Sequence, residues 1–161
     1  MTLTPDTLMA FVVATLIISL SPGPSNLYIM ACTLGSGRTG GTAAALGMAV
    51  GSSSYAIATA FGLAAVIAYV PVVFTVIKVL GALYLIYLGV TALRFAAAPH
   101  LRKPVQASTR RIVSRSLLVE LSNPKTALFF IAFLPQFTHA TGDVLIMDLL
   151  VLGLLFSVIA L

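Results

Sequence analysis

Charged residues are scarce in this chain of 161 residues, where they make up only 8% of the sequence. Soluble globular domains carry about 25% charged residues, so the composition excludes a soluble globular protein. Hydrophobic residues, in contrast, make up 60% of the chain. At roughly 20 residues per spanning helix, this length predicts an all-α, polytopic membrane protein of about five spans. We expect one transmembrane domain over residues 1–161 and no sizeable soluble domain.

Cysteine is nearly absent as well, since Cys32 is the single one. One cysteine excludes an internal disulfide and a two-cysteine redox relay. His100 and His139 lie too far apart in sequence to indicate a metal site, and no nucleophile–base set is visible. The sequence therefore predicts no enzyme, no metal and no cofactor. The N-terminal residues MTLTPDTL lack the basic region of a cleaved signal peptide, so we expect the first apolar stretch to stay in the mature protein.

Basic residues outnumber acidic ones by nine to four. Most of them lie in one stretch between apolar segments: Arg94, Arg102, Lys103, Arg110, Arg111 and Arg115. Cytoplasmic loops of membrane proteins carry an excess of Lys and Arg, so we interpret residues 95–115 as a cytoplasmic loop and expect no nucleic-acid partner. This orientation also places Arg38 in the cytoplasm, and the turns at 69–71 and 139–143 outside.

The apolar stretches predict five spans, at about residues 8–33, 42–69, 71–93, 116–133 and 144–161. The second span is rich in small residues, with Gly47 and Gly51 at GxxxG spacing. Small residues let helix backbones approach closely in lipid. We therefore expect this span to pack tightly against a neighbouring helix.

The first and fourth spans are interrupted by helix-breaking residues. Pro22, Gly23 and Pro24 lie within SLSPGPSN, and Asn123, Pro124 and Lys125 interrupt the fourth span. Prolines remove backbone donors and break the helical hydrogen-bond ladder. Inside a bilayer such breaks are tolerated only where they are buried in protein or line a cavity. Both breaks are therefore predicted to lie on a solute path.

The two breaks come into register when residue 22 is placed on residue 123, and the same alignment superimposes Gly41 on Gly142. The chain then divides into a first half-repeat at about 1–95 and an incomplete second one at about 116–161. Because three spans is an odd number, the second half crosses the membrane in the opposite direction. Such an inverted 3+3 repeat, here with the last helix missing, is typical of secondary transporters that bind their substrate near the bilayer midplane. We therefore expect residues 21–26 and 122–126 to meet near the bilayer centre.

The residues around the breaks are the candidate substrate-binding residues: Pro22, Gly23, Pro24, Asn26, Asn123, Pro124 and Lys125. Freed amides at a half-helix N-terminus favour a carboxylate, and freed carbonyls suit a cation. The alternative is a structural kink that neighbouring helices satisfy.

Lys125 is the strongest charged candidate because a charge near mid-depth costs several kcal/mol unless it is paired or hydrated. It could bind a substrate carboxylate or pair with Glu120. Glu120 could instead carry a proton, or lie at the cytoplasmic interface facing Arg115. Lys78 is expected to extend its ammonium to the outer surface.

Four segments together carry a resemblance to a known family: SPGPSNLYIM (21–30), the glycines between Gly35 and Gly51, GALYLIYLGVTALR (81–94) and NPKTALFFIAFLPQF (123–137). This combination resembles the LysE/RhtB family of amino-acid exporters, of the lysine exporter and homoserine-threonine efflux type. The resemblance implies a bacterial inner-membrane protein of about six spans that exports amino acids, driven by the proton gradient. Family members continue through a sixth span, whereas the second half-repeat here ends after its second helix.

The leading hypothesis is therefore a secondary transporter that exports amino acids. Glu120 is the one clear acidic residue within a span, which favours neutral or hydroxylated amino acids over basic ones. The alternative is a non-transporting membrane scaffold or an inactive truncated exporter. The expected partners are an amino-acid substrate and the lipid bilayer, and a homo-oligomer is left open.

Overall fold

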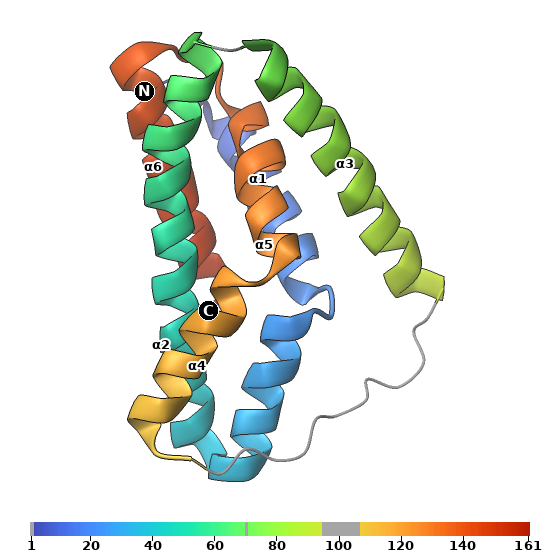
Figure 1. The fold of residues 1–161 in the computed structure, drawn as a ribbon, viewed down its shortest axis with the longest axis vertical. Coiled ribbons are helices and arrows are strands. Elements are labelled where there is room, and N and C mark those ends of the chain that lie inside the picture. The colour runs from blue at the N-terminus through green and yellow to red at the C-terminus, as the bar shows by residue number, and fades with distance from the viewer. Residues whose placement is uncertain (1, 70, 95–106) are drawn as a thin grey trace.

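The computed structural model describes residues 2–69, 71–94 and 107–161, and every regular element in these ranges is helical (Figure 1). The expected all-α fold is confirmed. The α-helices are α1 (Pro5–Leu20), α2 (Pro24–Tyr69), α3 (Pro71–Arg94), α4 (Thr109–Leu121), α5 (Pro124–Leu128) and α6 (Gly142–Ile159). A π-helix, η1 (Phe129–Phe133), and a 3-10 helix, η2 (Leu134–Phe137), continue α5.

Helix α2 is two antiparallel passes joined by a sharp turn. Ser36 and Gly37 have non-helical backbone angles, and Gly37 has a φ of 63°, a left-handed conformation that glycine adopts without a steric penalty. The chain descends to this turn and then climbs the full length of the molecule to Tyr69 (Figure 1). The stretch between the expected spans at 8–33 and 42–69 therefore contains a turn.

By length and composition, three of the described helices can cross a membrane, or four if a bent pair is one span. That pair joins residues 109–121 to residues 124–137 at a bend of 50°. The sequence predicts five spans instead. The difference arises because the first expected span is divided between α1, which has only 16 residues, and the first pass of α2.

Helix α4 begins earlier than expected. It starts at Thr109, with Ser108 in extended conformation at its N-cap, whereas the sequence predicts a loop up to residue 115. Residues 109–115 thus belong to the helix. The helical conformation lets this amphipathic segment bury Ile112 and Ser116 on one side. The rest of the expected basic loop, residues 95–106, lies outside the described residues.

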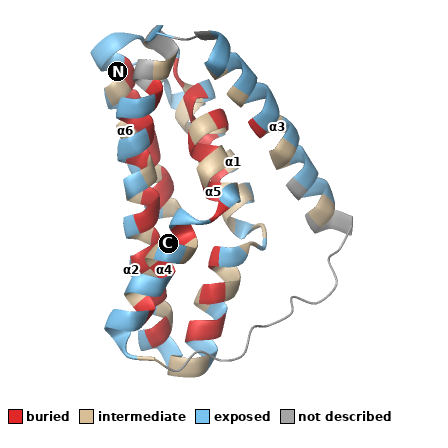
Figure 2. Cartoon of the chain, in the orientation of Figure 1, coloured by how far each residue is buried: buried red, intermediate tan, exposed pale blue. Residues whose placement is uncertain are grey.

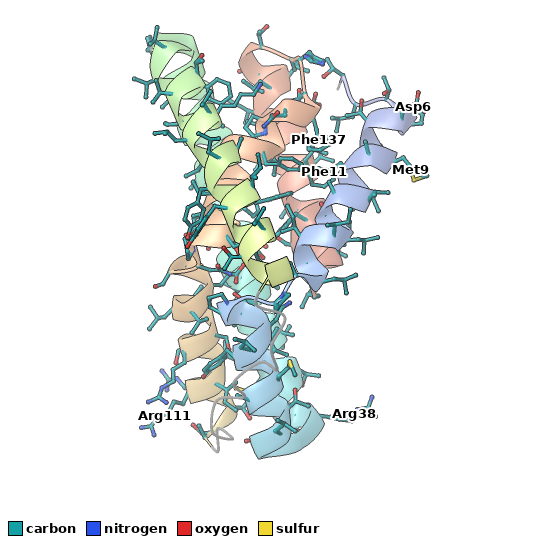
Figure 3. The ribbon with its side chains drawn as sticks, turned by 90° about the vertical axis from the view of Figure 1, so that its right-hand side faces the viewer. Asp6, Met9, Phe11, Arg38, Arg111 and Phe137 are labelled. Carbon is teal, nitrogen blue, oxygen red and sulfur yellow. The ribbon has the colours of Figure 1, made fainter. Side chains whose placement is uncertain are left out.

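The charged ends of the molecule agree with the predicted orientation. Arg38 and Arg111 extend from one end, and Asp6 lies near the opposite end (Figure 3). The expected cytoplasmic side is thus the end that carries these two arginines. Helix directions in Figure 1 also match an inverted repeat, because α1 and the first pass of α2 run opposite to α4 and α5.

Close backbone packing joins the second pass of α2 to α4. A Cβ atom built at Gly47 would collide with the Val113 carbonyl oxygen and lie 2.6 Å from Ser116 Cβ. One built at Gly51 would lie 2.8 Å from Glu120 Cβ. The two glycines therefore let the backbones of α2 and α4 approach closely, as small residues do in lipid. Helix α4 is also the helix that carries Glu120.

Two further features frame the bundle. A cluster of rings, including Phe11, Phe129 and Phe156, fills the space between α1, η1 and α6. Asp148 of α6 is fully buried and accepts hydrogen bonds from Thr2 Oγ1 (2.6 Å) and Thr138 Oγ1 (3.0 Å). Helix α3 packs on η1 at Gly81, where a built Cβ would collide with Ala132 Cβ, and most of its described side chains are exposed (Figure 2).

Replacing Gly47 by leucine is expected to destabilise the protein, because the new side chain meets the rigid backbone of α4. Overpacking of this kind costs roughly 1–3 kcal/mol, so the thermal unfolding midpoint in detergent should fall. The matched control is Gly62→Leu on the same helix, where no atom lies within 4 Å of a built Cβ. Equal midpoints for the two variants would contradict the predicted packing of α2 on α4.

Candidate functional site

The two helix breaks meet directly in the structure. Asn123 Nδ2 donates to Ser25 Oγ at 2.8 Å, and Lys125 Nζ donates to the Ser21 carbonyl at 2.9 Å. Hydrogen bonds therefore join the two breaks, although about 100 residues separate them in the sequence. The sequence-based expectation that the breaks face one another agrees with these contacts.

Lys125 satisfies the backbone that the first break opens. Pro22 lacks the N–H that would bond the Ile18 carbonyl in a continuous helix. Lys125 Nζ donates to that carbonyl at 3.0 Å, and its side chain packs on Gly23, where a built Cβ would lie 3.2 Å from Nζ. The ammonium therefore lies at the C-terminus of α1, where the helix dipole favours a positive charge.

The backbone at both breaks is completed by further side chains. Asn26 Nδ2 donates to the Ser19 carbonyl at 2.8 Å. At the second break, Asn123 Oδ1 accepts from the Lys125 backbone N–H at 3.1 Å and caps α5. Tyr55 OH donates to the Leu121 carbonyl at 2.6 Å, which this cap leaves without its helical donor.

Glu120 lies beside the breaks, buried within the helical bundle. It is only 5% exposed, and Ser25 Oγ donates to its carboxylate. The alternative that Glu120 faces Arg115 at the cytoplasmic interface is therefore wrong. The alternative of an ion pair between Lys125 and Glu120 is not formed among the described residues, where the Lys125 ammonium donates to backbone carbonyls.

Two cavities adjoin this cluster. The first has a volume of about 40 Å³, which suffices for a few water molecules but not for an amino acid. Its polar lining comes from Ser19, Ser25, Asn26, Ser52, Glu120, Asn123, Lys125, Thr126 and Ser157. The second cavity has a volume of about 450 Å³ and is mostly apolar. Ile18 and Lys125 line both cavities, so Lys125 lies at their boundary.

The predicted site residues thus divide into two groups. Asn26, Asn123, Lys125 and Glu120 line the polar cavity. Pro22, Gly23, Pro24 and Pro124 do not line either described cavity, and they act by shaping the breaks.

Ser25 was missed by the sequence analysis, although it contacts both Glu120 and Asn123. Its position between Pro24 and Asn26 in the first break is the signal that could have indicated it.

The fold and the paired breaks define the chain as a polytopic helical membrane protein with broken helices, a feature that also occurs in secondary transporters. The sequence model of the LysE type translocators matches residues 16–161. The chain belongs to this family. Its apolar helices and bacterial relatives identify it as a multi-pass protein of the bacterial inner membrane.

Several named relatives are similar over most of this chain. The leucine efflux protein of Salmonella typhimurium is 34% identical over 138 residues, which cover 82% of this chain and 63% of that protein. An uncharacterized membrane protein of Pseudomonas aeruginosa is 37% identical over 134 residues, covering 79% of this chain and 62% of its own length. The chain thus spans less than two thirds of the length of these relatives. No solved structure matches it.

Replacing Ser25 by alanine is expected to destabilise the protein. The substitution leaves the buried Glu120 carboxylate and Asn123 Nδ2 without their partner, and an unsatisfied buried polar group costs roughly 1–3 kcal/mol. The measurement is the thermal unfolding midpoint in detergent. Ser54→Ala is the matched control, because Ser54 is exposed and its hydroxyl donates, within the described part of the chain, to the Val50 carbonyl of its own helix. A midpoint for Ser25→Ala as high as that of the control would rule out the network.

Proposed function

We propose that this chain takes part in the export of amino acids across the inner membrane as a secondary transporter. The observation that carries the proposal is Lys125, a charged side chain between two cavities whose ammonium is held by backbone carbonyls of a broken helix. A charge inside a membrane domain is costly and by default marks a functional site. The efflux function named for the Salmonella relative supports the same proposal.

Lys125 is proposed to bind the substrate carboxylate. An arriving carboxylate would replace the Ile18 and Ser21 carbonyls as acceptors for the ammonium, since opposite charges attract strongly in a low-dielectric site. The released carbonyls would then be available to the ammonium group of the amino acid. Substrate and Lys125 thus exchange partners at the break, and no backbone group loses its hydrogen bond.

A neutral amino acid is the proposed cargo. Glu120 is the one acidic residue that lines either described cavity, and its carboxylate is already bonded by Ser25. A basic side chain would need a further buried carboxylate as its partner. Several relatives are named leucine efflux proteins, which agrees with a neutral cargo.

Glu120 is the proposed proton carrier. It is buried beside the water-sized cavity, and it adjoins the break through Ser25. Because Ser25 is bonded in turn by Asn123, a change in the protonation of Glu120 would alter hydrogen bonding at both breaks. This chain of contacts would couple a proton to the substrate site.

Replacing Lys125 by glutamine is expected to reduce export of a neutral amino acid by roughly tenfold or more, which corresponds to about 1.4 kcal/mol of lost substrate binding. The measurement is efflux of radiolabelled leucine from proteoliposomes. Lys78→Gln is the matched control, because Lys78 is exposed on α3 and lines neither described cavity. Unfolding midpoints of both variants would separate lost binding from lost folding.

Two outcomes would contradict the transport proposal. The first is leucine efflux by Lys125→Gln at the level of the control, since the carboxylate site would then lie elsewhere. The second is a folded, unsubstituted chain that neither binds nor moves any amino acid, which is the result expected of a membrane scaffold.

Replacing Glu120 by glutamine tests whether Glu120 carries the coupled proton. The amide oxygen can still accept from Ser25, so the network keeps its shape, but the side chain no longer binds and releases a proton. We expect efflux to lose its dependence on an imposed pH gradient, while exchange of internal for external leucine continues. A variant that still responds to the gradient as the unsubstituted chain does would exclude Glu120 as the carrier.

A further inference from the structure

The larger cavity lies between α1, α3 and the segment that follows the second break. Its lining comes from Ile17, Ile18 and Ser21 on α1 and the first break, from Ala82, Leu85, Ile86 and Gly89 on α3, and from Lys125, Phe133 and Gln136. At about 450 Å³, it falls within the roughly 300–1,000 Å³ that small-molecule sites occupy.

The lining of this cavity is amphipathic. Its polar groups are few, namely Ser21, Lys125 and Gln136, and aliphatic residues of α1 and α3 supply most of the remaining wall. A site of this kind suits a ligand with one polar end and one apolar end. A hydrocarbon chain alone would make no use of the Lys125 ammonium at its edge.

We propose that this cavity receives the side chain of the exported amino acid, and that α3 sets the size of side chain that fits. The inference rests on the proposed function, because the carboxylate at Lys125 fixes which end of the substrate faces α3. The substrate class is then neutral amino acids with aliphatic side chains of about leucine size. Ala82 and Gly89 are the residues that determine specificity, because their small side chains leave the cavity open.

Gly89 offers the sharpest test of this assignment. A Cβ built there meets no atom within 4 Å, so a larger side chain can enter the cavity without pushing on the protein. Gly62 on α2 is equally open but does not line either described cavity. Gly62→Leu therefore matches Gly89→Leu in chemistry and in helical setting, and it differs in location.

The experiment compares radiolabelled leucine with radiolabelled alanine in the purified, reconstituted chain. For Gly89→Leu we expect the KM for leucine efflux to rise by roughly tenfold or more, the scale on which an apolar pocket discriminates by size. The KM for alanine should change by less than about twofold, because its methyl group does not reach the filled space. Gly62→Leu should leave the ratio of the two KM values unchanged.

Three results would overturn the inference. An unchanged leucine-to-alanine ratio in Gly89→Leu would show that the side chain lies elsewhere. An unchanged ratio together with loss of co-purified phospholipid would assign the cavity to an acyl chain. If the unsubstituted chain binds neither amino acid, the proposed function fails and this inference fails with it. The first two results leave the proposed function intact, because leucine efflux by the unsubstituted chain would still be measured.

Discussion

The need to pair opened backbone groups within a bilayer is the constraint on which this structure depends. Each break removes helical hydrogen bonds that lipid cannot replace, and carbonyls opened at both breaks recover a side-chain partner from another part of the chain. Lys125 closes the break after α1, and Tyr55 closes the one after α4. Because these partners come from the opposite half of the molecule, satisfying the backbone also fixes how the two halves meet.

The packing of the remaining helices holds the two breaks in contact. Because Gly47 and Gly51 have no side chains, α2 lies directly against Ser116 and Glu120 of α4, and this contact holds Glu120 beside the first break. At one end, Asp148 holds Thr2 and Thr138 together, so the chain around α1 is tied to α6. Helix α3 packs against η1 where Gly81 meets Ala132, and it forms one wall of the large apolar cavity.

Much of the fold and part of the site could be predicted from the sequence, because proline and small residues have local effects that spacing reveals. The breaks, their mutual contact and the close packing at Gly47 follow from such rules. The start of α4 was missed because basic residues indicate sidedness but not backbone conformation. The role of Ser25, and the absence of an ion pair between Lys125 and Glu120, depend on side-chain directions across helices that no spacing in the chain encodes.

The separation of Lys125 from Glu120 bears on how such a site can work. A lysine paired with a buried carboxylate would need to break a strong attraction before it could bind a substrate carboxylate. Backbone carbonyls are neutral acceptors, and they hold the ammonium by hydrogen bonds without neutralising its charge. Under the proposed function, the charge would therefore remain available to a carboxylate that enters from the cavity. One of these acceptors is the Ile18 carbonyl. It is open to Lys125 because Pro22 has no N–H to donate to it as in a continuous helix. The helix break thus supplies acceptors that hold the half-buried Lys125 ammonium in place.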